Sequence, residues 1–205
     1  MRSHIFKWIV YGVFFGVFMI ACAGTKLTHT RLDETYQGKP VSNILVIAIT
    51  HNKENRQSFE DKFVAQLKAV GIEAVSSVDV IPIPPDMELK KDEILKAVNK
   101  FKNDAVIITH LVGVEEKESY VPPERHRGGY YGYYGWAYNH THEPGYYLSK
   151  TLVRLATNLY DVKTEKLIWS GQSETLDPGS INQIIDDVID VLIKDLQKNR
   201  LLPTK

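Results

Sequence analysis

Cysteine is almost absent from this sequence, because Cys22 is the only one among 205 residues. A lone cysteine excludes an internal disulfide. The sequence also lacks a Gly-x-Ser-x-Gly elbow, a phosphate-binding glycine loop and a His-Glu-x-x-His pair. Its formal net charge is zero, so the basic surface typical of nucleic-acid binding is missing. These absences argue weakly against an enzyme, and we predict no catalytic residue, no cofactor and no nucleic-acid partner.

The N-terminus carries a short apolar run with a positive flank. Arg2 and Lys7 precede the run, which extends from Trp8 to Ala21 and stops at Cys22. About 14 residues are too few to cross a hydrocarbon core of ~30 Å as a helix. A positive flank, a short apolar core and a small residue before the cleavage point are the three parts of a secretory signal. Residues 1–21 are therefore predicted to be a signal peptide, with an uncleaved membrane anchor as the alternative.

The end of this run, Met19-Ile20-Ala21-Cys22, resembles the processing site of bacterial lipoprotein signals, in which leucine is usual where Met19 stands. The resemblance implies that Cys22 is acylated and becomes the first residue of the mature protein. Acyl chains contribute about 0.8 kcal/mol per buried methylene, so two or three of them hold a protein on a bilayer. In the enterobacterial sorting pattern, Ala23 after the cysteine implies the outer membrane, on its periplasmic side.

Residues 22–42 are polar and show no sustained periodicity, which predicts a lipidated tether. Fully extended, about 20 residues reach roughly 65 Å. The rest of the chain has an ordinary globular composition, since 43% of all residues are hydrophobic and 24% are charged. Its length suits one core better than two, so we predict a single domain over residues 43–199.

The pattern of apolar residues predicts an α/β domain. Strands are expected at residues 43–50, 72–76 and 104–112, separated by helices at 58–71 and 90–102. This β-α-β-α-β order favours parallel strands. An antiparallel hairpin follows at residues 147–160 and 166–175. Ser180 and Gln183 form a capping box for a C-terminal helix. The residues of that helix expected to face inward are Ile181, Ile185, Val188, Leu192 and Leu196. The predicted fold class is thus a single α/β domain with a mixed sheet, an antiparallel hairpin and a C-terminal helix.

The turn of this hairpin, from Leu159 to Gly171, has a recognisable pattern. Asp161 ends one strand, a Thr-x-Lys turn follows, and a Trp-Ser pair lies in the next strand. The segment resembles the hairpin of bacterial envelope lipoproteins with TolB N-terminal or CsgG-like α/β modules, and the order of elements from Asn43 to Leu196 is similar too. The resemblance implies an envelope lipoprotein whose module serves assembly or binding rather than chemistry.

Residues 119–147 interrupt the regular pattern with an insertion rich in tyrosine and glycine. Its five glycines are expected to prevent a rigid helix or a packed core. Its aromatic rings offer a large contact area for a protein or glycan partner. The candidate partner-binding residues are Tyr130, Tyr131, Tyr133, Tyr134, Trp136 and Tyr138. A loop without a defined ligand is the alternative.

Two groups of titratable residues are candidate sites. His140 and His142 are alternate residues, which point the same way in an extended strand and could share a metal such as zinc. Solvated loop histidines are the alternative. His110 ends a predicted strand and is followed by Glu115, Glu116 and Glu118, so it could form an acid/base group at the carboxyl end of the sheet. The alternative there is a charged strand face in solvent.

Three classes of function remain open from the sequence. A membrane-anchored, non-enzymatic binding or assembly module of the cell envelope is favoured. The alternatives are a hydrolase acting on the cell wall and a periplasmic metal-handling protein.

Overall fold

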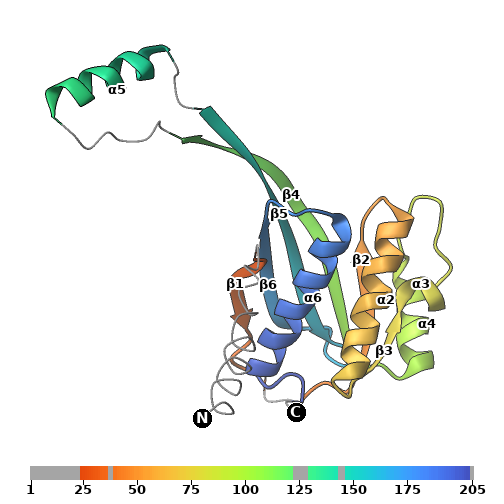
Figure 1. Ribbon diagram of the computed structural model, residues 1–205. Helices are drawn as coiled ribbons and strands as arrows, with labels where there is room; N and C mark the ends of the chain where they lie inside the picture. The colour runs from red at the N-terminus through yellow and green to blue at the C-terminus, as the bar shows by residue number, and fades with distance from the viewer. Residues whose placement is uncertain (1–23, 37–38, 122–128, 143–145, 204–205) are drawn as a thin grey trace, which may run out of the picture.

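The computed structural model describes residues 24–36, 39–121, 129–142 and 146–203. One six-stranded sheet has the order β1-β6-β5-β4-β2-β3 (Figure 1). The strands are β1 (Lys26–Leu32), β2 (Asn43–Ile49), β3 (Glu73–Ser76), β4 (Ala105–Val121), β5 (Tyr146–Asp161) and β6 (Leu167–Leu176). β2 is parallel to both β3 and β4, whereas the other pairs are antiparallel. The predicted α/β fold with a mixed sheet, an antiparallel hairpin and a C-terminal helix is confirmed.

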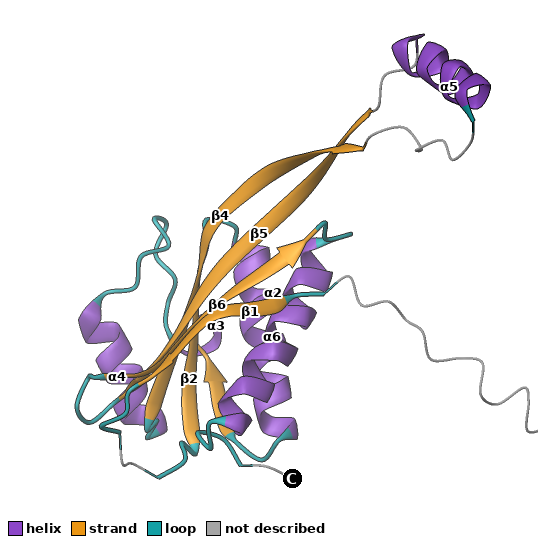
Figure 2. Cartoon of the chain, turned by 90° about the vertical axis from the view of Figure 1, so that its left-hand side faces the viewer, coloured by secondary structure: helices purple, strands orange, loops and turns teal. Residues whose placement is uncertain are grey.

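Helices cover the two faces of the sheet unequally. They are α2 (Lys53–Ala69), α3 (Ser77–Val80), α4 (Lys91–Phe101), α5 (Tyr130–His142) and α6 (Ile181–Lys198). α2 and α6 cover one face, and α4 lies on the other (Figure 2). None of the helices in the described ranges combines the length and apolar character that a membrane crossing requires.

The alternation of side chains along β2 shows why this strand lies at the centre. Ile44 and Val46 belong to the core beneath α2 and α6, whereas Leu45 and Ile47 belong to a second cluster beneath α4. All four are buried. The continuous apolar run in the sequence is therefore a strand covered on both faces, as predicted.

Both long helices begin at side-chain caps. Ser180 accepts a hydrogen bond from the Gln183 amide at 3.1 Å, so the predicted N-cap of α6 is confirmed. The Gln183 side chain accepts from the amide of Gly179 and not from that of Ser180, so the reciprocal bond of the predicted capping box is shifted by one residue. The start of α2 was predicted wrongly. Asn52 caps this helix by accepting from the Asn55 amide at 2.8 Å, so α2 begins before Ser58.

β1 corrects the prediction that residues 22–42 form a tether. This mostly polar strand pairs with the edge of β6 and satisfies backbone groups that β6 would otherwise expose, while Leu27 packs against the core. Thr25 shares a 2.7 Å hydrogen bond with Thr175, and Lys26 lies 3.7 Å from Glu174. Only Ala23 and Gly24 separate Cys22 from the part of the chain that is held on the sheet.

β4 and β5 extend far beyond their neighbours. β2 ends opposite His110, and β6 ends opposite Leu152. Past these points residues 116–121 and 146–151 pair only with each other, and we call this two-stranded extension the arm. It projects from the domain in Figures 1 and 2. The outer ends of the predicted insertion are therefore strand.

The helix α5, between the two strands of the arm, corrects the expectation that glycines exclude a helix from the insertion. Gly132 and Gly135 each cost about 1 kcal/mol relative to alanine. Ring contacts along the helix offset part of this cost: Tyr133 and Trp136 have centroids 5.6 Å apart, and Tyr134 and Tyr138 are stacked at 6.4 Å.

Gly171 is required by the indole that packs on it, and Gly171→Ala is expected to destabilise the domain. Trp169 is fully buried and donates a 2.9 Å hydrogen bond to Asp195 of α6. A β-carbon at Gly171 would lie 2.3 Å from the Trp169 ring. Overpacking of this kind costs about 1–3 kcal/mol, measurable by urea unfolding.

Gly113 is the matched control for this substitution. It also lies in a strand, but a β-carbon there would meet no atom within 4 Å. Gly113→Ala should leave the unfolding midpoint nearly unchanged. Equal effects of the two substitutions would contradict the role assigned to the Trp169 contact.

Candidate functional site

An apolar pocket of about 310 Å³ opens at one end of the sheet, between the carboxyl end of β2, the middle of β4 and the first turns of α2 and α6. Its lining is drawn from five elements and the residue after β2. These residues are Ala48, Ile49, Thr50, Asn55, Phe59, Thr109, His110, Leu111, Val114, Val153, Leu155, Ile181, Ile184 and Ile185. The carboxyl ends of parallel strands are where α/β proteins commonly bind ligands.

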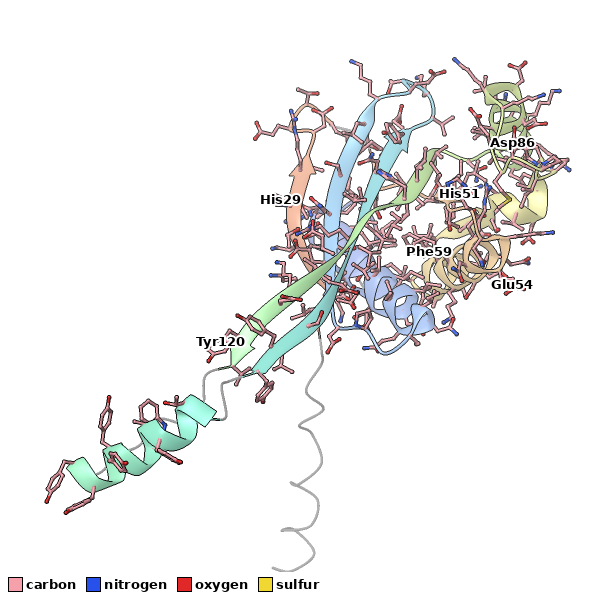
Figure 3. The ribbon with its side chains drawn as sticks, turned by 90° about the horizontal axis from the view of Figure 1, so that it is seen from above. His29, His51, Glu54, Phe59, Asp86 and Tyr120 are labelled. Atoms are coloured by element: carbon pink, nitrogen blue, oxygen red, sulfur yellow. The ribbon has the colours of Figure 1, made fainter. Side chains whose placement is uncertain are left out.

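The pocket has a buried wall and an exposed aliphatic rim. Phe59 is only 5% exposed and lies on the side of α2 that faces the sheet (Figure 3). The rim residues Ile49, Leu111, Val114 and Ile181 are between 53% and 59% exposed. Exposed aliphatic side chains gathered around an apolar concavity are typical of a binding surface. Ile181 was predicted to face inward, and its exposure corrects that expectation.

The buried wall of the pocket is held by an ion pair. Arg56 and Glu60 are buried one turn apart on α2, with 3.1 Å between Nε and Oε1. Glu60 also accepts a 2.8 Å hydrogen bond from the amide of Ala48, which lines the pocket. The pair thus ties the end of β2 to the helix that carries Phe59.

The lining offers little acid/base chemistry. His110 is its only titratable residue, and no carboxylate or amine occurs among the lining residues that the structure describes. The Thr109 hydroxyl is occupied by a 2.9 Å hydrogen bond with Thr157. The arrangement is therefore suited to binding an apolar group rather than to transferring a proton between paired groups.

The predicted group of His110 and Glu116 is not brought together. A bulge between Leu111 and Gly113 shifts the register of β4, so that His110 pairs with Ala156 and Glu116 pairs with Thr151. Ala156 and Thr151 are five residues apart, and an odd separation places two residues on opposite faces of a strand. The bulge thus separates two side chains that their even spacing would have placed on one face. Glu118 is exposed on the arm.

Charged residues form a separate cluster on the sheet face opposite α2 and α6. Arg154 binds Glu115 of β4 and Glu174 of β6, and Lys26 of β1 lies beside Glu174. The hydrogen bond from Arg154 lowers the pKa of Glu174 below its usual value. Hydrogen bonds to Glu115 and Glu174 raise the pKa of Arg154. The cluster links four neighbouring strands and fastens β1 to the sheet.

A second hollow, of about 630 Å³, lies along the turn after β1 and has a mainly polar lining. Its carboxylate Asp33 accepts hydrogen bonds from the amide and hydroxyl of Thr35 at 2.9 and 2.7 Å. The hydroxyl bond is the main reason that the pKa of Asp33 is lowered. These bonds shape the turn, so we assign Asp33 a structural role.

The predicted aromatic residues lie on α5, which Figure 1 shows apart from α2 and α6, the helices that help to line the pocket. The five tyrosines of this helix are between 57% and 78% exposed: Tyr130, Tyr131, Tyr133, Tyr134 and Tyr138. Trp136 is half-buried. The structure therefore gathers all six candidate partner-binding residues on one helix, although their role in binding stays a prediction.

The predicted metal pair also falls on α5. The backbone is helical at His140 and His142, and residues two apart on a helix do not face each other. The shared orientation expected from an extended strand is therefore lost. Their side chains lie outside the described residues, and so does Cys22, the predicted lipid attachment point. No group of three or more metal-ligating side chains occurs within the described ranges.

The pocket rim was missed in the sequence. Ile49 is the last residue of an apolar run, and Leu111 and Val114 continue another run beyond the point where β2 ends. The one local signal of this surface is an apolar run that continues beyond the point where the neighbouring strand ends. Without the strand order, that signal cannot be distinguished from ordinary strand ends.

No known family model and no curated protein sequence matches this chain. Distant structural similarity to bacterial lipoproteins is found. PelC of Paraburkholderia phytofirmans, a dodecamer in its crystals, is 12% identical with a TM-score of 0.46, covering 88% of this chain and 99% of PelC. Lipoprotein GNA1162 of Neisseria meningitidis is 15% identical with a TM-score of 0.42, and the match covers 77% of this chain and 99% of GNA1162.

A minor lipoprotein of Acinetobacter baumannii is 10% identical with a TM-score of 0.35, covering 80% of this chain and 98% of its own. These similarities concern the fold and not the partners or the activity of the chain. The more specific resemblance to TolB N-terminal or CsgG-like modules stays a prediction.

Proposed function

We propose that this protein is a lipid-anchored, non-enzymatic binding module of the bacterial cell envelope, acylated at Cys22, which takes up an apolar segment of a partner protein in the pocket. The proposal is carried by the exposed rim of Ile49, Leu111, Val114 and Ile181 around a concavity that lacks paired acid/base groups. An outer-membrane location on the periplasmic side belongs to the same proposal and is supported by Ala23 after the cysteine.

The chemistry of the rim favours a protein segment over a glycan at this site. Sugars bind proteins through stacking on exposed rings and through polar side chains, but Phe59, the one phenylalanine, tyrosine or tryptophan among the described lining residues, is buried. A volume of about 310 Å³ falls at the small end of the range of about 300–1,000 Å³ for ligand pockets. Apolar side chains of an anchoring segment fit that size.

The open edge of β4 is a second reason to expect a protein segment at this pocket. β2 ends opposite His110, so the backbone of Leu111 and the following residues has no strand of the described chain on that side. An extended segment can add to such an edge through main-chain hydrogen bonds while its side chains enter a pocket. The edge and the rim share Leu111 and Val114, so one segment could use both.

Photo-cross-linking in living cells tests this proposal. A photoreactive residue at Ile181, on the rim, should give a discrete adduct with a protein partner, whereas one at Asp190, exposed on α6 away from the rim, should not. Leu111→Glu should then reduce the Ile181 adduct strongly, because it places a charge in an apolar contact. Equal adducts from both positions, or an adduct that survives Leu111→Glu, would contradict the proposed site.

A further inference from the structure

We propose that α5 rests in the headgroup region of the bilayer that carries the lipid anchor, so that the arm provides a second membrane contact. This inference rests on the proposed acylation of Cys22 and adds to it. Three observations on the described residues support it: the chemistry of α5, the distribution of charge along the arm, and the end of the sheet at which the chain approaches its anchor.

The chemistry of α5 matches a membrane–water interface. The helix contains five tyrosines and one tryptophan but no aspartate, glutamate, lysine or arginine. Tyrosine and tryptophan concentrate at the headgroup level, where the ring lies among apolar groups and the polar tip stays hydrated. Four of these tyrosines, Tyr130, Tyr131, Tyr133 and Tyr134, are more than 60% exposed, so their rings are available to a surface.

The rings also share a broad side of the helix. At 3.6 residues per turn, Tyr130, Tyr131, Tyr134 and Tyr138 fall within an arc of about 100°, and Tyr133 and Trp136 extend this arc on one side. Gly132 and Gly135 lie on the remaining side. Aromatic rings over one broad side of a helix can rest at the headgroup level of a bilayer.

The arm changes from charged to aromatic along its length. Its inner part carries Lys117, Glu118 and Lys150. Two to three residues farther out, Tyr120 and Tyr147 pair across the strands with ring centroids 5.3 Å apart. Figure 3 shows Tyr120 at the outer end of the arm, on the side of α5. Among the paired residues of the arm, charges thus lie toward the domain and aromatic rings toward the outer end, an order that favours an approach of this end to a bilayer surface.

The predicted anchor Cys22 is only three residues before Thr25, which lies at the end of the sheet from which the arm projects. Thr25 is bonded to Thr175, which pairs with Val153, and the arm begins two residues farther along β5 at Thr151. Three residues from Cys22 to Thr25 span at most roughly 11 Å. An acylated Cys22 would therefore hold this end of the domain near the bilayer.

The arm is long enough to cross that gap. Its six residue pairs extend about 20 Å, which exceeds the span between Thr25 and the anchor. α5 stays near the tip, because only residues 143–145 separate His142 from Tyr146. Whether the arm points at the bilayer or lies along it, α5 is within reach of the surface.

Fluorescence quenching in vesicles tests this contact on the full lipidated protein. The mature chain has two tryptophans, Trp136 on α5 and the buried Trp169. Vesicles of phosphatidylethanolamine and phosphatidylglycerol with brominated acyl chains should quench part of the emission. The quenching should disappear in Trp136→Phe, which leaves only Trp169, and should persist in Trp169→Phe, which leaves only Trp136.

Flotation of the same vesicles separates the possible failures. Protein that floats and shows quenching of Trp136 supports the bilayer contact. Protein that floats without this quenching overturns the contact and leaves the lipid anchor standing. Protein that neither floats nor shows quenching overturns both.

A change in Trp136 fluorescence on addition of peptidoglycan fragments or of an envelope protein, without quenching by brominated lipid, would assign α5 to that partner and overturn the bilayer contact.

A tenfold weaker binding to unbrominated vesicles is expected for Cys22→Ala carrying Tyr131→Ser and Tyr134→Ser, relative to Cys22→Ala alone. Equal binding of these two proteins would contradict the role of the rings.

Discussion

Cys22→Ala is expected to abolish the incorporation of labelled fatty acid into this protein. Cys22 is the only cysteine, so no other thiol can carry the acyl group. At about 0.8 kcal/mol per buried methylene, the loss of two or three chains removes most of the attraction to the bilayer. Metabolic labelling with palmitate, followed by immunoprecipitation, measures the result directly.

Labelling is the decisive readout, because an unprocessed apolar run of about 14 residues could still hold the variant on a membrane. Thr25→Ala is the matched control, since it changes a residue near the anchor and removes the bond to Thr175 but keeps the cysteine. Label that persisted in Cys22→Ala would show that the anchor is elsewhere.

Arg56→Ala is expected to lower the free energy of unfolding by about 3–5 kcal/mol. Arg56 and Glu60 are 2% and 0% exposed, and the substitution leaves the Glu60 carboxylate buried without its cation. Arg56 also donates to the Ser77 hydroxyl at 3.0 Å and to the carbonyl of Met87 at 3.2 Å. The substitution therefore removes three hydrogen bonds together with the charge, and urea unfolding of the mature protein measures the loss.

A double variant separates the charge from the packing. Arg56→Met with Glu60→Gln removes both charges and keeps most of the side-chain volume, so it should be more stable than Arg56→Ala alone. A loss below about 1 kcal/mol for Arg56→Ala would contradict the role assigned to the pair. Because Glu60 binds the amide of Ala48, Arg56→Ala should also loosen the pocket and weaken the cross-link from Ile181.

Much of the fold could be predicted from local sequence patterns. The apolar run Asn43–Ile49 is a strand buried on both faces, and Ser180 caps the C-terminal helix. These features depend on periodicity and on contacts within a few residues, so they are readable without a structure. The start of α2 was missed because Asn52 and Ser58 are both good caps, and only the contacts of the folded helix distinguish them.

Of the two candidate surfaces, one could be suggested from local sequence and the other could not. The density of tyrosine predicted a contact surface, from composition alone, in the segment that folds as α5. The pocket rim could not be identified, because Ile49, Leu111 and Ile181 come from three elements that are distant in sequence. Each residue alone resembles an ordinary end of a strand or helix.

By itself, the sequence determined the order of the main elements, the parallel arrangement around β2, the predicted anchor at Cys22 and the aromatic character of the insertion. Only the tertiary structure decided that the polar residues 26–32 form a strand, because the free edge of β6 supplies their hydrogen-bond partners. It also decided that His110 and Glu116 lie on opposite faces of the sheet, because one extra residue in the β4 bulge reverses the alternation of side chains that a regular strand would have kept.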